Sequence, residues 1–148
     1  MNIFKAVICH DYTVLRVKRG VLHLKTNGVH MIGIAWVANV LSIAGIYIAY
    51  FLVNNQRNFV YDLLFELHYW ELAGRVGMII LLTFIYAISF AAFGGKQTFV
   101  EVINEFAKLD ESEQIAVSRR GGKYFYGSLL LLMLVIGTLL YLTKIAGY

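Results

Sequence analysis

The sequence contains no proline and a single cysteine, Cys9. Many transporters build a site in the middle of the membrane from broken helices, so the absence of proline favours straight helices instead. One thiol can form no disulfide within the chain and cannot hold a zinc ion by itself. The residues before Cys9 are too few for the charged and apolar regions of a signal peptide. We therefore interpret Cys9 as a free thiol packed among apolar neighbours.

Charged residues are also scarce, since they make up 15% of the 148 residues while 59% are hydrophobic. Soluble globular domains contain about 25% charged and about 45–50% apolar residues. A chain of this size must also cover most of its outside with polar groups if it is surrounded by water. The net charge of +4 is divided among separate polar segments, unlike the continuous basic surface that binds nucleic acid. The composition predicts an integral membrane protein with no nucleic-acid partner.

Three long apolar runs cover about residues 30–53, 73–95 and 124–146. Each run is long enough to cross a hydrocarbon core of about 30 Å at a rise of about 1.5 Å per residue. The backbone must satisfy its own hydrogen bonds in lipid, so each run should be a helix. The runs are continuous rather than alternating, which excludes a barrel. We predict an all-α protein with a three-span membrane domain over residues 30–148.

Lysine and arginine alternate between the two sides of this predicted bundle. They gather in residues 1–29 and in the loop 96–123, whereas the loop 54–72 has one arginine and three acidic residues. Short basic segments stay on the cytoplasmic side of a membrane. We therefore expect the N-terminus and the second loop in the cytoplasm, and the first loop and the C-terminus outside. The expected location is the inner (cytoplasmic) membrane of a bacterium.

The second loop predicts an amphipathic helix over about residues 98–118. Thr98 and Glu101 have the spacing of a capping box at its start, and Asp110 with Glu113 would begin a second short helix that reaches Ser118. Gly121 and Gly122 would end that helix before the third span. The helix either lies on the membrane surface or docks a cytoplasmic partner. Its apolar face is formed by Phe99, Val102, Ile103, Phe106 and Leu109.

Residues 1–29 form a basic cytoplasmic or interfacial segment. Within it, apolar and polar residues alternate over residues 12–26, which fits a small β-hairpin, although an amphipathic helix is an alternative. Anionic lipid attracts each nearby basic side chain by about 1 kcal/mol. The residues expected to contact the membrane surface are Arg16, Lys18, Arg19, Lys25, Arg119, Arg120 and Lys123.

No set of residues predicts catalysis or metal binding, and we expect no cofactor. His30, at the cytoplasmic end of the first span, is a candidate haem ligand, because axial histidines hold haem in membrane proteins. His68 would lie on the opposite side of the membrane, so the second ligand would have to come from another subunit.

A few weakly polar residues lie within the three spans, where there is no ionisable group at mid-depth. They either form hydrogen bonds between helices, worth about 0.6 kcal/mol each on average, or line a pore made from several copies. Small residues such as Ala35, Ala87 and Ala91 should let helices approach closely. The candidates for pore lining or packing are Asn39, Thr83, Ser89, Ser128 and Thr138.

Three helices cannot enclose a wide cavity by themselves, so the chain should assemble with other membrane subunits or with further copies of itself. We expect a non-enzymatic small integral membrane subunit or scaffold of a larger membrane complex. One alternative is a homo-oligomeric pore or channel, similar to holins in size and span number only. The other is a haem or quinone anchor subunit of a respiratory enzyme.

Overall fold

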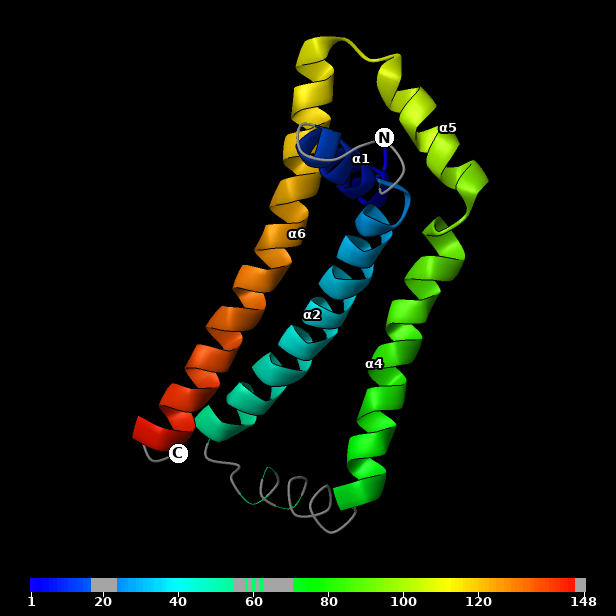
Figure 1. Cartoon of the computed structure of the whole chain (residues 1–148). Helices are drawn as coiled ribbons and strands as arrows, with labels where there is room; N and C mark the ends of the chain where they lie inside the picture. Colours follow the sequence, from blue (N-terminus) through cyan, green and yellow to red (C-terminus); the bar gives the residue numbers. More distant parts are fainter. Residues whose placement is uncertain (17–23, 55–57, 59, 61, 63–70, 146–148) are drawn as a thin grey trace.

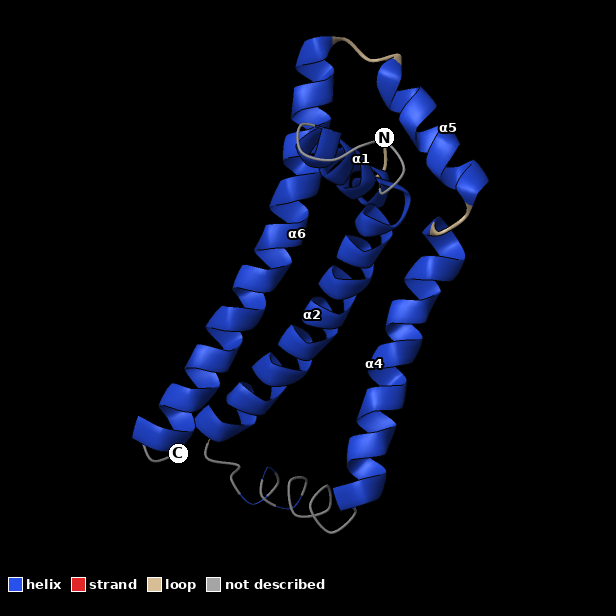
Figure 2. Ribbon diagram, in the orientation of Figure 1, coloured by secondary structure: helices blue, strands red, loops and turns tan. Residues whose placement is uncertain are grey.

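A computed structural model describes residues 1–16, 24–54, 58, 60, 62 and 71–145, and this part of the chain is helical almost throughout (Figure 2). None of these described residues forms a β-strand. The elements in chain order are α1 (Ile3–Arg16), α2 (Leu24–Val53), α4 (Glu71–Phe93), α5 (Lys96–Ala107) and α6 (Glu111–Leu140), which continues into a π-helical turn, η2 (Tyr141–Ile145).

Three helices are long and apolar enough to cross a membrane: Gly28–Val53 in α2, Arg75–Phe93 in α4 and Glu111–Lys144 through α6 and η2. This confirms the predicted helical fold with three apolar helices of membrane-spanning length. α2 lies between α4 and α6, and the two chain termini lie at opposite ends of the bundle (Figure 1). α1 and α5 lie at the end where the chain begins.

α1 lies across this end of the bundle and packs against α6 and α2, with a smaller contact to α5. Its residues Ala6–Cys9 are almost completely buried. Ile32 of α2 and Val102 and Phe106 of α5 belong to the same apolar core. We call α1, α5 and residues 111–122 of α6 the helical cap. Cys9 is free and buried in this core, which confirms its interpretation as a packed thiol.

The described parts of the segment 12–26 are helical rather than extended. Residues 12–16 end α1 and residues 24–26 begin α2, so the described parts belong to two different helices. The remaining residues of the predicted hairpin, 17–23, lie outside the described residues.

The second loop folds as α5 followed by the first turns of α6, with the expected second helix start at Asp110. The Asp110 cap is confirmed, because its side chain accepts a hydrogen bond of 2.7 Å from the amide of Glu113. The capping box at Thr98 is wrong: α5 begins at Lys96, and its N-cap is Gly95 without a side-chain hydrogen bond. The break at Gly94–Gly95 after α4 lets α5 begin two residues before the predicted start at Thr98.

The prediction that Gly121 and Gly122 end a helix is also wrong, because α6 runs through both glycines without a break. A methyl group on Gly121 would overlap the carbonyl of Ala6 and lie 2.7 Å from the amide nitrogen of Val7. The glycines therefore let the backbone of α1 rest directly on α6.

Phe4 of α1 makes aromatic contacts with all three apolar helices. Its ring lies 5.4 Å from Trp36 of α2, 5.7 Å from Phe93 of α4 and 5.8 Å from Tyr124 of α6, measured between ring centroids. Such tilted and edge-on aromatic pairs each contribute about 0.5–1.5 kcal/mol beyond the area they bury. This cluster joins the cap to the membrane-spanning bundle.

Candidate functional site

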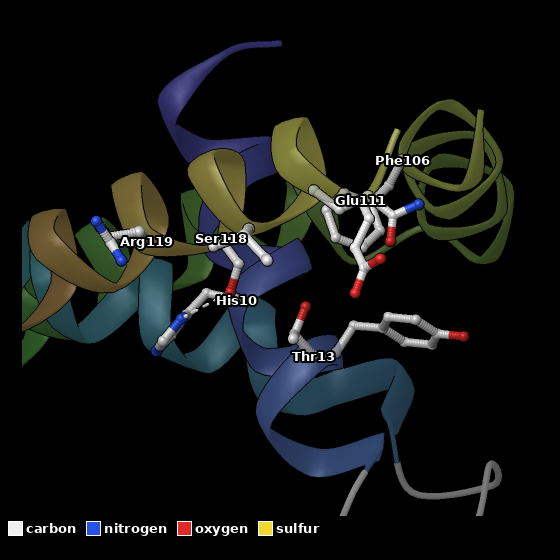
Figure 3. A pocket seen from close by; sticks show the side chains of 9 residues that line it. His10, Thr13, Phe106, Glu111, Ser118 and Arg119 are labelled. Atoms are coloured by element: carbon white, nitrogen blue, oxygen red, sulfur yellow. Dashed lines mark hydrogen bonds between the residues drawn. The ribbon is translucent and has the colours of Figure 1, made fainter. Parts of the chain in front are cut away.

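A pocket of about 450 Å³ opens in the helical cap between α1 and the first turns of α6 (Figure 3). Cavities of about 300–1,000 Å³ with a few polar groups on largely apolar walls are typical of small-molecule sites. Phe106 closes one side from α5. The lining residues are His10, Tyr12, Thr13, Phe106, Glu111, Gln114, Ile115, Ser118 and Arg119.

His10 is held in one orientation on the wall of this pocket. Its Nδ1 lies 3.3 Å from the Oγ of Ser118, and its ring meets the ring of Tyr126 edge-on at 5.9 Å. A methyl group on Gly122 would lie 2.7 Å from Cε1 of the imidazole, so the missing side chain makes room for the ring. Burial lowers the pKa of His10, and the contact with Ser118 offsets part of this shift. Burial therefore favours the neutral imidazole, and no hydrogen bond joins its Nε2 to another described residue.

Opposite charges stand at the two ends of the pocket. Glu111 and Arg119 are eight positions apart on α6, which is about 12 Å along a helix axis. Both side chains are exposed, and neither forms an ion pair with another described residue. Figure 3 shows Arg119 on the side of His10 and the carboxylate of Glu111 toward Thr13.

The contact between His10 and Ser118 is not extended to a catalytic triad among the described residues. A serine nucleophile needs a base, a third group that orients the base, and donors for the oxyanion. His10 and Ser118 provide the first contact, but no described carboxylate bonds to His10. The neighbouring Asp11 instead accepts a hydrogen bond from the backbone of Gly28, and burial raises its pKa to about 6.

His30, the predicted haem ligand candidate, lies between α2 and α4. Its Nδ1 shares a hydrogen bond with the hydroxyl of Tyr86, and its ring lies 4.9 Å from the ring of Phe90. A metal on this side chain would therefore have to bind Nε2. No group of three histidine, cysteine, aspartate or glutamate side chains is placed to hold a metal ion in the part of the chain that the structure describes.

Three of the five pore or packing candidates form hydrogen bonds at helix contacts. Asn39 of α2 donates to the hydroxyl of Tyr124 of α6 at 3.1 Å, and Ser128 donates to the carbonyl of Tyr124 at 2.9 Å. Ser89 is fully buried between α4 and α2 and donates to the carbonyl of Tyr86. A methyl group on Gly33 would lie 2.7 Å from the hydroxyl of Ser89, so α2 and α4 approach closely there.

The other two candidates face outward. Thr138 is exposed on α6, where its hydroxyl donates to the carbonyl of Leu134 at 2.9 Å, and Thr83 is exposed on α4. Asn39 therefore bonds the side chain of Tyr124 across the α2–α6 contact, whereas Ser128 bonds the backbone of Tyr124 within α6.

The basic residues predicted to contact the membrane surface lie at the cap end wherever they are described. Arg119, Arg120 and Lys123 are exposed on α6 just before Tyr124. Arg16 ends α1, and Lys25 lies in the first turn of α2. Lys18 and Arg19 lie outside the described residues.

No local pattern in the sequence predicts the pocket. Its two walls, around His10 and Ser118, are separated by 108 positions in the chain, and neither wall contains a recognisable motif. The glycine pair 121–122 is the one local signal for this packing. A glycine inside a helical segment often allows another part of the chain to pack closely against it.

Comparisons with known proteins give no identification. No family model matches the chain, and no curated protein and no solved structure matches it.

Proposed function

We propose that this chain is a non-enzymatic subunit or scaffold of a larger membrane complex, and that the outward face of α4 binds a neighbouring subunit. In this proposal the protein lies in the cytoplasmic membrane of a bacterium, with the helical cap in the cytoplasm and the C-terminus outside.

The proposal rests on α4, of which the rest of the chain buries very little. In its most apolar stretch 6% of the residues are buried, against 33% in α2 and 17% in α6. Among the described side chains of α4, only Ser89 is buried, and it lies against α2. Helices associate in lipid through close packing rather than through a hydrophobic driving force, so a span that is so little buried gains most from a partner.

The outward face of α4 also has the residues that close helix packing requires. Thr83, Ala87 and Ala91 recur at every fourth position and are all exposed. Small side chains at this spacing let the backbone of a second helix approach. The pore alternative has less support, because Asn39, Ser89 and Ser128 bond within the chain.

Cross-linking at this face tests the proposal. A photoreactive residue at Ala87 should capture a different membrane protein in native membranes, whereas the same residue at Ala44, which is exposed on α2, should capture mostly lipid. Capture of a second copy of this chain at Ala87, together with ion conductance of the purified protein, would support the pore alternative. Equal capture at both positions would contradict a specific face on α4.

Replacing a small residue on the same face gives a second test. Ala87→Leu should release the chain from its complex, because the added side chain holds the partner helix away. Ala44→Leu serves as the matched control and should leave the complex intact. An intact complex in both variants would remove α4 as the contact surface.

A further inference from the structure

The pocket of the helical cap opens at the level where lipid headgroups would lie. Arg119, Arg120 and Lys123 are exposed on α6 immediately before its long apolar part, which starts at Tyr124. Basic side chains favour the anionic headgroup layer, and tyrosines favour the same depth. The Arg119 end of the pocket therefore faces the membrane surface, and the Glu111 end points away from it.

The membrane end of the pocket can bind a phosphate group. The guanidinium of Arg119 is without an ion pair among the described residues, and a planar fork of N–H donors matches phosphate oxygens. The contact to Ser118 through Nδ1 leaves Nε2 of His10 for a second hydrogen bond. Figure 3 shows His10 and Arg119 on the same side of Ser118.

The opposite end of the pocket suits an ammonium group. The carboxylate of Glu111 lies there, next to the hydroxyl of Thr13. Thr13 donates its proton to the carbonyl of Cys9, so its oxygen is left to accept. The two acceptors at this end suit a positively charged group of the ligand. The two donors at the other end suit a negatively charged group.

An apolar path continues from the pocket along α6 into the membrane. Tyr126 contacts the ring of His10, and Leu130, Met133 and Leu134 follow it on the same face of the helix at spacings of four, seven and eight residues. All four side chains are 57–73% exposed. A ligand held in the pocket could therefore lay a hydrocarbon chain on this face.

We infer that this pocket binds the headgroup of an aminophospholipid of the phosphoethanolamine class. Its phosphate is bound by Arg119 and His10, its ammonium group by Glu111, and one of its acyl chains by the path from Tyr126 to Leu134. This site is separate from the α4 face, so it does not depend on the proposed partner subunit. Phosphatidylglycerol offers the phosphate but no ammonium group, and it leaves Glu111 without a cation.

Native mass spectrometry of the full-length protein can test the site. The protein is exchanged in mild detergent into equal amounts of phosphatidylethanolamine and phosphatidylglycerol, and the retained lipids are counted. The wild type should retain one phosphatidylethanolamine with about tenfold preference, since one charge-assisted hydrogen bond corresponds to about a power of ten in affinity. Arg119→Gln should lose both lipids, and Glu111→Gln should keep a lipid but lose the preference.

Matched variants on the same helix serve as controls. Arg120→Gln and Glu113→Gln remove exposed charges next to the test residues, but neither residue lines this pocket, so both should retain phosphatidylethanolamine as the wild type does. Equal loss in Arg119→Gln and Arg120→Gln would overturn the site in favour of unspecific attraction to the basic surface. Displacement of the lipid by inorganic phosphate or free phosphoethanolamine at millimolar concentration would overturn the lipid as ligand and indicate a soluble phosphate compound.

Discussion

At Gly121 the backbones of α1 and α6 are in direct contact, because the carbonyl of Ala6 and the amide of Val7 occupy the space of a side chain. The neighbouring atoms are backbone atoms, so they cannot move aside as the end of a flexible side chain would. A glycine inside a helix destabilises it by about 1 kcal/mol relative to alanine. The contact with α1 is the physical reason for glycine at this position.

Gly121→Ala should therefore destabilise the protein although alanine favours helices. Overpacking of this kind costs about 1–3 kcal/mol, and we expect the upper end because α1 has to shift as a whole. The thermal unfolding midpoint in mild detergent measures the effect. Gly127→Ala is the matched control on the same helix, because nothing lies within 4 Å of a methyl group there; it should raise the midpoint slightly. A stabilised Gly121→Ala variant would contradict the described contact.

Asp11 makes stability depend on pH. Burial raises its pKa from 3.8 in the unfolded chain to about 6. Below pH 3.8 the carboxyl group is protonated in both states, and between about pH 4 and 6 the unfolded chain releases the proton while the folded chain keeps it. The free energy of unfolding therefore falls as the pH rises through this window, by about 2–3 kcal/mol, and stays constant above it.

Asp11→Asn should remove this loss, because the amide oxygen can still accept the hydrogen bond from Gly28 while no charge is buried. We expect the stability of the variant relative to wild type to increase from pH 4 to pH 6. Unfolding midpoints of both proteins over this range measure the difference. The lowered pKa of His10 changes stability with pH in the opposite direction, but this contribution is common to both proteins. A difference that does not change with pH would show that Asp11 is solvated.

Among the elements, α5 is attached to the rest of the helical cap by two kinds of contact of different strength. Phe106 is 5% exposed and packs in the core beside Ile8 and Ile32. Glu105 pairs with Lys5 of α1 at 3.0 Å, but the two side chains are 53% and 33% exposed. Half-exposed ion pairs contribute about 0–1 kcal/mol, whereas the loss of a buried phenylalanine side chain costs about 3–5 kcal/mol.

Phe106→Ala should therefore release α5 and Glu105→Gln should not. Hydrogen exchange of the α5 amides, measured in detergent for both variants, reports the attachment. We expect faster exchange over Lys96–Ala107 in Phe106→Ala and unchanged exchange in Glu105→Gln. The reverse result would mean that the ion pair holds the helix.

The elements differ in how far the sequence predicts them. The three spans follow from long apolar runs, and the cap of α6 follows from Asp110, because both signals are local. The helix α1 was not predicted: its short apolar stretch, residues 6–9, is buried by partners on α2, α5 and α6. The glycine pair was misinterpreted as a helix end for the same reason, since the contact that explains it comes from Ala6 and Val7. The pocket depends on the same packing of α1 against α6, so local sequence patterns could not predict it.

For the whole molecule, the fold places the N-terminus with α5 at one end and the C-terminus at the other (Figure 1), in agreement with the alternation of basic segments. Single cysteines can test on which side each end lies. On intact cells a membrane-impermeant maleimide should label Asn54→Cys, at the far end of α2, and should label Glu113→Cys, in the helical cap, only after permeabilisation. Cys9 should not react, because burial raises its pKa to about 12. Labelling of Glu113→Cys on intact cells would reverse the predicted orientation.

We propose that this chain works as one subunit among others in the membrane. The mass of the native particle after extraction in mild detergent, with identification of every chain that it contains, tests this proposal. We predict a particle with at least one other membrane protein in fixed stoichiometry, which is lost in Ala87→Leu and retained in Ala44→Leu. A particle made only of this chain, whether a monomer or a closed ring of copies, would contradict a role as one subunit among others.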